Sequence, residues 1–252
     1  MDYKQICSSL VLIMLAGPAN VEAAEATLAV ASNFTAPANQ LVEEFESQTD
    51  HEISLVFGSS GRFFAQISNG APFDLFLSAD QEKPRALIES NLAVAESLFT
   101  YALGGLVLWS SDEQLVDGFT VLDSDRFQKL ALANSRLAPY GVAAEEVIDQ
   151  LGLLNALQAK LVRGENIAQT YQFVFTGNAE LGFVAKSQVY KNNSLQSGSA
   201  WNVPANLHSS ITQDAVLLQR ASGNSAALDF IEFLQSDRGR SIIQSFGYTV
   251  EE

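Results

Sequence analysis

Short apolar runs alternate with stretches of helical periodicity in the first third of the chain. The run at 27–31 predicts a buried strand, and apolar positions at helical spacing follow it. The runs at 53–57 and 73–79 predict two more strands, and the glycine- and serine-rich loop 58–61 separates 53–57 from a second helix. Strands that alternate with helices in this way are typical of an α/β protein with parallel strands.

The same alternation returns in the second half of the chain. Apolar runs at 129–133, 159–163 and 181–185 predict three strands. Helical spacing starts at Pro139, which suits a first helical turn because proline has no N–H to leave unsatisfied there. Apolar residues at helical spacing appear again at 167–177. Each cluster therefore has two junctions at which a strand ends and a helix begins.

Two extended apolar segments, 101–110 and 209–218, connect the two clusters and are predicted to be crossing strands. The tail, 228–250, is predicted to form two helices and a terminal strand that return to the first cluster. Ligands of open parallel sheets bind outside the carboxyl ends of the strands. We therefore expect two lobes that face each other across a cleft and bring all four junctions together. The predicted division is lobe I at 25–103 and 212–252, and lobe II at 104–211.

The N-terminus has the layout of a secretory signal peptide. A short polar start is followed by an apolar run at 6–17, too short to span a bilayer as a helix, and by small residues that include Val21-Glu22-Ala23. We predict a cleaved signal peptide at 1–24. The alternatives are a membrane anchor or a buried first helix.

Charge and cysteine content exclude several classes of protein. The formal net charge is −15, and removal of the signal peptide would leave 27 acidic against 13 basic residues. A chain this acidic is not suited to nucleic acid or to anionic membrane surfaces, which both require clustered lysine and arginine. Cys7 is the single cysteine and lies in the signal peptide, so the mature chain has no disulfide or thiolate metal site. A secreted protein without lipid or disulfide is expected in a periplasm.

The loop 58–61 does not carry a recognised catalytic motif. It lacks the length and the Lys-Ser/Thr of a phosphate-binding P-loop, and it does not fit the G-x-S-x-G nucleophile elbow. A serine hydrolase also needs a histidine base, and His51 and His208 are the two histidines of the chain. The acidic residues show no metal-ligand spacing, so neither a metal site nor another cofactor is predicted.

Anion binding at helix N-termini fits the junctions best. Each helix start offers free backbone N–H groups and the positive end of the helix dipole. The hydroxyl groups of Ser32, Ser59 and Ser60 and the amide of Asn33 add side-chain donors. The alternative is that these side chains are only N-caps of their own helices. Because the loops lack Asp and Glu, they suit a fully ionised tetrahedral dianion better than a protonated one, although the Asn33 oxygen could accept.

Five segments resemble the periplasmic molybdate-binding proteins of molybdate ABC transporters (ModA type). The resemblance covers nearly the whole mature chain, and its most specific parts are FGSSG to FLSAD, NAELGF and QDAVLL. It implies a type II periplasmic binding-protein fold that closes on molybdate or tungstate and delivers it to an inner-membrane ABC permease. The segments are 26–34, 56–84, 101–110, 165–189 and 201–218.

The resemblance also implies which residues hold the anion. It assigns side-chain contacts to Ser32 and Ser60, backbone N–H contacts to Tyr140 and Ile167, and a contact through backbone or side chain to Asn33. Some members of the family carry a ligand-contacting tyrosine where this chain has Ala185, whose side chain cannot donate. The number of hydrogen bonds to the anion is therefore left open.

The sequence thus predicts a monomeric periplasmic receptor that binds molybdate, and also tungstate, by hydrogen bonds and catalyses nothing. Within the same class, the alternative is a receptor for sulfate, chromate or another oxyanion. From other classes, the alternatives are a secreted serine hydrolase that uses Ser60 and a ligand-sensing domain that acts on a signalling partner.

Overall fold

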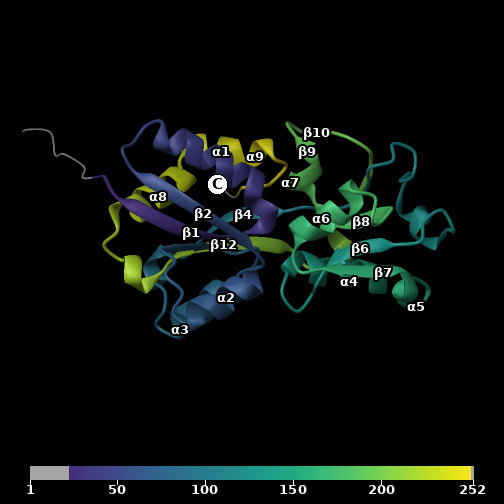
Figure 1. The fold of residues 1–252 in the computed structure, drawn as a ribbon, viewed down its shortest axis with the longest axis horizontal. Helices are drawn as coiled ribbons and strands as arrows, with labels where there is room; N and C mark the ends of the chain where they lie inside the picture. The colour runs from purple at the N-terminus through teal and green to yellow at the C-terminus, as the bar shows by residue number, and fades with distance from the viewer. Residues whose placement is uncertain (1–22, 251–252) are drawn as a thin grey trace, which may run out of the picture.

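Two five-stranded sheets form the centres of two lobes in the computed structural model, which describes residues 23–250 (Figure 1). We use lobe I for the first sheet with its helices, and lobe II for the second. The first sheet has the order β2-β1-β3-β12-β4, with β1 Glu25–Ala31, β2 Glu52–Gly58, β3 Leu75–Leu77, β4 Phe99–Gly104 and β12 Ile211–Leu217. The second has the order β11-β5-β8-β6-β7, with β5 Leu106–Ser110, β6 Leu130–Ala133, β7 Leu161–Gly164, β8 Leu181–Ala185 and β11 Ser199–Asn202.

In each sheet, three strands on one side pair in parallel, and the pairings on the other side are antiparallel. In lobe I, β1 pairs in parallel with β2 and β3, while β12 is antiparallel to β3 and β4. In lobe II, β6 pairs in parallel with β7 and β8, while β5 is antiparallel to β8 and β11. The predicted α/β class and the predicted parallel strands are confirmed.

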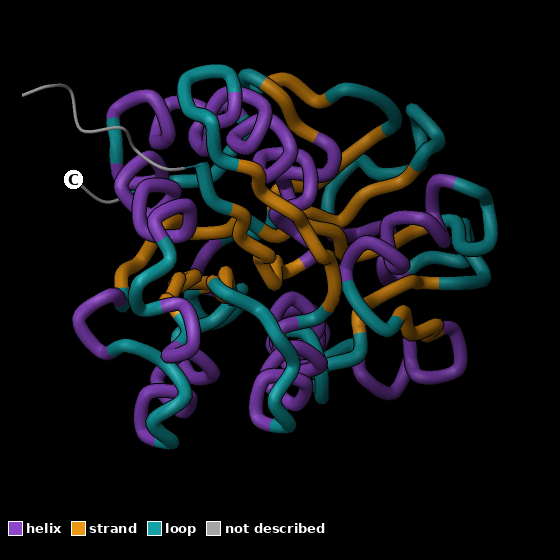
Figure 2. Tube along the Cα trace, turned by 60° about the vertical axis from the view of Figure 1, so that its left-hand side comes forward, coloured by secondary structure: helices purple, strands orange, loops and turns teal. Residues whose placement is uncertain are grey.

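Helices cover both faces of each sheet, because the core strands are apolar on both sides. In lobe I, α1, α8 and α9 lie over one face and α2 and α3 over the other; in lobe II, α4 and α6 lie on opposite faces (Figure 1). Turned by 60°, the trace shows most strands inside the molecule with helices around them (Figure 2). The helices are α1 Thr35–Glu46, α2 Ser60–Ser68, α3 Glu82–Glu89, α4 Pro139–Gln150, α5 Leu154–Leu157, α6 Ile167–Phe175, α7 Lys186–Val189, α8 Ser225–Gln235 and α9 Asp237–Ser245.

The chain passes between the lobes in two places. It leaves lobe I at the end of β4 and enters lobe II as β5, with Gly105 between the two strands. It returns from β11 to β12, so the predicted crossing segments 101–110 and 209–218 correspond to β4–β5 and β12. The division between residues 103 and 104 and between 211 and 212 stays a prediction.

Several features of the fold differ from the sequence predictions or go beyond them, among them the helices α3, α5 and α7 and the strand β11, which were not predicted. The predicted terminal strand is a single antiparallel bridge between Leu103 and Thr249. The hairpin β9 Tyr190–Lys191 and β10 Ser194–Leu195 was not predicted, because two-residue strands carry no periodicity. Six 3₁₀ turns were also not predicted: η1 Ser32–Phe34, η2 Ala95–Ser97, η3 Phe119–Asp123, η4 Gln158–Lys160, η5 Ala205–Leu207 and η6 Gln219–Ala221.

Apart from Ala23 and Ala24, the predicted signal peptide lies outside the described residues. Within residues 23–250, the helices are too short or too polar to cross a membrane.

Candidate ligand-binding site

Four strand-to-helix junctions, two from each lobe, meet at one small cavity. Its volume is about 10 Å³, which suits a single small ion, since pockets for organic ligands are typically ~300–1,000 Å³. The lobe I junctions are β1–η1 and β2–α2, and the lobe II junctions lead into α4 and α6. The lining residues are Ala31, Ser32, Asn33, Gly58, Ser59, Ser60, Ala79, Ala138, Pro139, Tyr140, Asn166 and Ile167.

The lining of this cavity is electrically neutral. All twelve lining residues are uncharged, although the chain as a whole has a formal charge of −15. The charged pair Arg62–Glu165 joins α2 to the loop before α6 at 3.4 Å, but both side chains are more than half exposed, so it contributes little. An anion in the cavity would therefore be held by N–H and O–H dipoles and by helix N-termini.

Ser60 is the best placed side-chain donor. It is the first residue of α2, is 1% exposed, and its Oγ accepts a hydrogen bond from the N–H of Ala79 at 2.9 Å. This bond fixes the oxygen and leaves the hydroxyl hydrogen free to donate into the cavity. Ser59 also lines the cavity, but as N-cap residue it makes no side-chain capping bond.

The β1 junction contributes Ser32 and Asn33, both buried in the turn η1. The Nδ2 of Asn33 donates to Gln213 Oε1 at 2.8 Å and to the Tyr248 hydroxyl at 2.9 Å. Both hydrogens of this amide are thus used within the protein. Asn33 was predicted to donate to the anion through its backbone or its side chain, and only its backbone N–H remains available for this contact.

The lobe II junctions offer backbone N–H groups. Tyr140 follows Pro139 as the second residue of α4, and Ile167 is the first residue of α6, so neither N–H has an acceptor within its helix. Asn166 caps α6 by accepting from the N–H of Gln169 at 3.0 Å. The carbonyl of Ile167 accepts from Gln188 Nε2 at 3.1 Å, which fixes this junction from behind.

All five residues predicted from the resemblance line this one cavity: Ser32, Asn33, Ser60, Tyr140 and Ile167. Their role as ligand contacts remains a prediction. Ala185 is fully buried and is not one of the residues that line the cavity. Its N–H donates to Gln188 Oε1 at 2.9 Å.

The side chains of Ser32, Ser59 and Ser60 do not cap their own helices, so the N-cap alternative is wrong for these side chains. Ser32 and Ser60 are the first residues of their helical segments, with Ala31 and Ser59 as the cap residues, and the Ser59 side chain makes no cap bond.

The histidines do not support the hydrolase alternative. His51 is buried between the N–H of Ala24 and the carboxylate of Asp229. His208 bonds its neighbour Ser209. Within residues 23–250 neither ring is hydrogen-bonded to Ser60, so this serine has no base in the structure.

Behind the cavity lies a buried polar cluster that was not predicted from the sequence. Its members are hydrogen-bonded side chains from distant parts of the chain, and three of them are tyrosines. Burial raises the pKa of Tyr101 and of Tyr140 well above the usual value, and it raises the pKa of Tyr248 to about 12. The members are Asn33, Tyr101, Tyr140, Ser187, Gln213 and Tyr248.

We expect this cluster to make the protein sensitive to alkali. The pKa of Tyr248 is higher in the folded than in the unfolded chain. The contribution of Tyr248 to the free energy of unfolding is therefore complete below about pH 10 and is lost as the pH rises toward 12. The free energy of unfolding should fall by on the order of 2–3 kcal/mol over this range from Tyr248 alone. Urea unfolding at a series of pH values measures the fall, and Tyr248→Phe should make it shallower. A constant unfolding free energy over this range would contradict the expectation.

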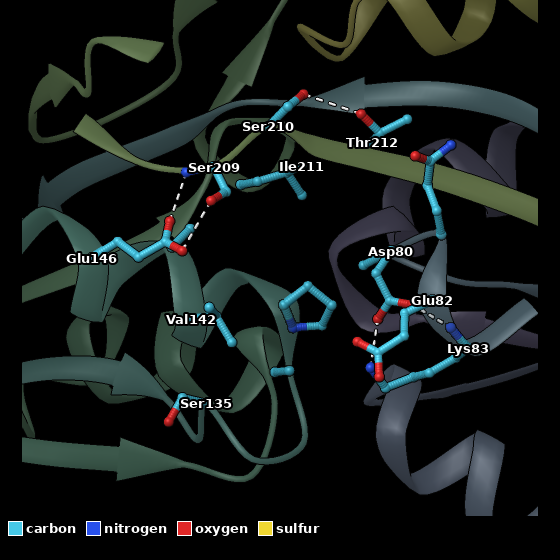
Figure 3. A pocket seen from close by; sticks show the side chains of 15 residues that line it. Asp80, Glu82, Lys83, Ser135, Val142, Glu146, Ser209, Ser210, Ile211 and Thr212 are labelled. Atoms are coloured by element: carbon cyan, nitrogen blue, oxygen red, sulfur yellow. Dashed lines mark hydrogen bonds and ion pairs between the residues drawn. The ribbon is translucent and has the colours of Figure 1, made fainter. Parts of the chain in front are cut away.

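A larger groove of about 390 Å³ lies beside the cavity and shares Ala79, Ala138 and Pro139 with it. Asp80, Glu82 and Lys83 line one wall and Glu146 the other (Figure 3). Lys83 is paired with Asp80 at 2.7 Å, while Glu146 accepts from the N–H and the hydroxyl of Ser209 (Figure 3). The excess of carboxylates makes this groove unsuited to an anion, in contrast to the neutral cavity.

Comparisons with known proteins give a consistent result. The model of the family "Bacterial extracellular solute-binding protein" matches residues 26–249. The chain is 48% identical over 231 residues to a molybdate-binding protein ModA of Azotobacter vinelandii, covering 91% of this chain and 92% of that protein. It is 44% identical over 245 residues to a molybdate-binding protein ModA of Rhodobacter capsulatus, covering 97% and 95%. The solved structure of an Azotobacter vinelandii periplasmic molybdate-binding protein superposes with a TM-score of 0.87 at 36% identity, covering 90% of this chain and all of that one.

Proposed function

Because the chain belongs to the family of bacterial extracellular solute-binding proteins, we propose that it is a periplasmic receptor for molybdate and tungstate. The observation that carries the proposal is the neutral cavity at four helix starts, which offers hydrogen-bond donors and no charged side chain among its lining residues. Relatives that are named molybdate-binding proteins support the same anion. In this role the protein binds and releases its ligand without chemical change.

The donor pattern favours a fully ionised dianion over hydrogen phosphate. The hydroxyl of Ser60 is oriented by Ala79, and the side-chain oxygen of Asn166 is already occupied by the N–H of Gln169. The O–H of hydrogen phosphate would therefore depend on another acceptor, such as the side-chain oxygen of Asn33, and a buried donor left unpaired costs ~1–3 kcal/mol. Sulfate carries the same charge and shape as molybdate, so discrimination between them has to come from the size of the closed cavity.

The remaining parts of the proposal concern location and partners. The predicted signal peptide supports export to the periplasm, and the ABC permease is the partner that receives the anion. We propose that a single copy of the chain is sufficient for binding, because both walls of the cavity come from one chain.

A thermal-shift panel tests the anion. Molybdate and tungstate should raise the melting temperature, while sulfate and phosphate should do little. At about 100 times its Kd, a ligand that binds only the folded state stabilises it by roughly 2.7 kcal/mol. No shift with either molybdate or tungstate would overturn the proposal, and a shift with sulfate or chromate alone would favour the alternative oxyanion receptor.

A further inference from the structure

The polar cluster behind the cavity connects the two lobes. Tyr101, Gln213, Asn33 and Tyr248 come from β4, β12, the β1 junction and the end of the chain, all in lobe I. Tyr140 and Ser187 come from α4 and α7, in lobe II. All six are buried, with at most 6% of each residue exposed. Such a cluster is stable only when its donors and acceptors are paired, because an unpaired polar group is costly at low local dielectric.

Three hydrogen bonds of the cluster cross from one lobe to the other. Gln213 Nε2 donates to the Tyr140 hydroxyl at 3.3 Å. The Ser187 hydroxyl donates to the carbonyl of Asn33 at 2.7 Å, and the Tyr248 hydroxyl lies 3.0 Å from Ser187 Oγ. These bonds can exist only while the lobes are in contact. In contrast, the bonds of Tyr101, to Ser78 O and Gln213 Oε1 at 3.0 Å each, stay within lobe I.

Tyr140 contributes to both the cavity and the cluster. Its backbone lines the cavity at the start of α4, while its hydroxyl reaches the point at which β4 ends. A Cβ at Gly104 would overlap this hydroxyl and would lie 2.6 Å from Gln213 Nε2. A glycine at the crossing between the lobes is therefore needed to admit the tyrosine of the other lobe.

We propose that this cluster is a latch that couples anion capture to lobe closure, with Tyr140 and Ser187 as its positioning residues in lobe II. The inference rests on the proposed function, since it takes the cavity as the anion site. When the lobes close, the step that brings the N–H of Tyr140 to the anion also brings its hydroxyl to Gln213. The hydrogen bonds to the anion and those of the latch therefore form together and stabilise the same state.

The experiment compares Tyr140→Phe with Tyr101→Phe. Each removes one hydroxyl from the same buried cluster and leaves every backbone N–H of the cavity in place, but only Tyr140→Phe removes a bond between the lobes. We expect Tyr140→Phe to raise the Kd for molybdate by about two- to tenfold, mainly through faster release, and Tyr101→Phe to change it by less than about twofold. Ser187→Ala should act like Tyr140→Phe and serves as a second test if that variant folds poorly.

A second readout does not depend on the ligand. The N–H of Gly61 in lobe I donates to the carbonyl of Leu137 in lobe II at 2.9 Å, so hydrogen exchange of this amide reports lobe closure. This amide should exchange faster in Tyr140→Phe than in Tyr101→Phe. The melting temperature without ligand should fall by a similar amount in both variants. Equal effects of the two variants on Kd and on this exchange would overturn the latch and leave a purely structural cluster. If the wild-type protein binds no oxyanion, the proposed function fails, and exchange in the ligand-free protein still decides the latch.

Discussion

Ser60→Ala is expected to weaken molybdate binding by about 1.5–3 kcal/mol, the range for a hydrogen bond to a charged partner. The substitution removes the one hydroxyl of the cavity whose oxygen is fixed by the protein, through the N–H of Ala79. It also leaves that N–H without its acceptor in a buried site, which costs about 1–3 kcal/mol of folding stability. Titration calorimetry measures the first effect, and urea unfolding of the ligand-free protein measures the second.

Ser59→Ala is the matched control for this prediction. Ser59 lies in the same loop and lines the same cavity, but its side chain makes no cap bond, so ligand-free stability should stay nearly constant. We also expect a smaller loss of affinity than for Ser60→Ala. Unchanged affinity in Ser60→Ala would remove Ser60 from the site. An ester hydrolase activity that disappears with Ser60 would instead support the serine hydrolase.

The junctions could be predicted from sequence because their signals are local. Apolar strands such as 53–57 and helical spacing after 58–61 reveal where a strand ends and a helix begins, and parallel strands place these ends at one edge of a sheet. The first and fourth of the predicted junctions, at Ser32 and Ile167, are found at the same cavity. Tyr140 and Ile167 could be assigned only through the resemblance. Every residue except proline has a backbone N–H, so the residue type does not show which N–H contacts a ligand.

The latch could not be predicted, because its contacts are distant in sequence. Asn33 and Tyr248 are 215 residues apart, and Asn33 and Gln213 are 180 apart. Periodicity marks Tyr140 as a residue at the start of a helix, and it does not show that the hydroxyl reaches the other lobe. The hydrogen bond of Ser60 could not be predicted for the same reason, since its partner Ala79 follows β3 and is 19 residues away.

Gly141→Ala is expected to damage both stability and binding, because it acts on the backbone of the α4 junction. The glycine packs against the end of β6, and an added Cβ would overlap the carbonyl oxygen of Ala133 and lie 2.8 Å from the N of Ser135. These are backbone atoms that no side-chain rotation can move away. The start of α4 would have to shift, at a cost of about 1–3 kcal/mol for overpacking.

The shift would move the neighbouring N–H of Tyr140 away from the anion, and binding sites must be held to within about 0.5 Å. We therefore expect a loss of affinity of at least about tenfold, which corresponds to roughly 1.4 kcal/mol. Titration calorimetry and urea unfolding measure the two effects. The control is Gly223→Ala, where an added Cβ meets nothing within 4 Å and the backbone is not in the left-handed region, so both quantities should stay near the wild-type values. Wild-type affinity in a destabilised Gly141→Ala protein would mean that binding of the anion does not depend on the position of the first turn of α4. Tyr140 would then have to be removed from the proposed contacts.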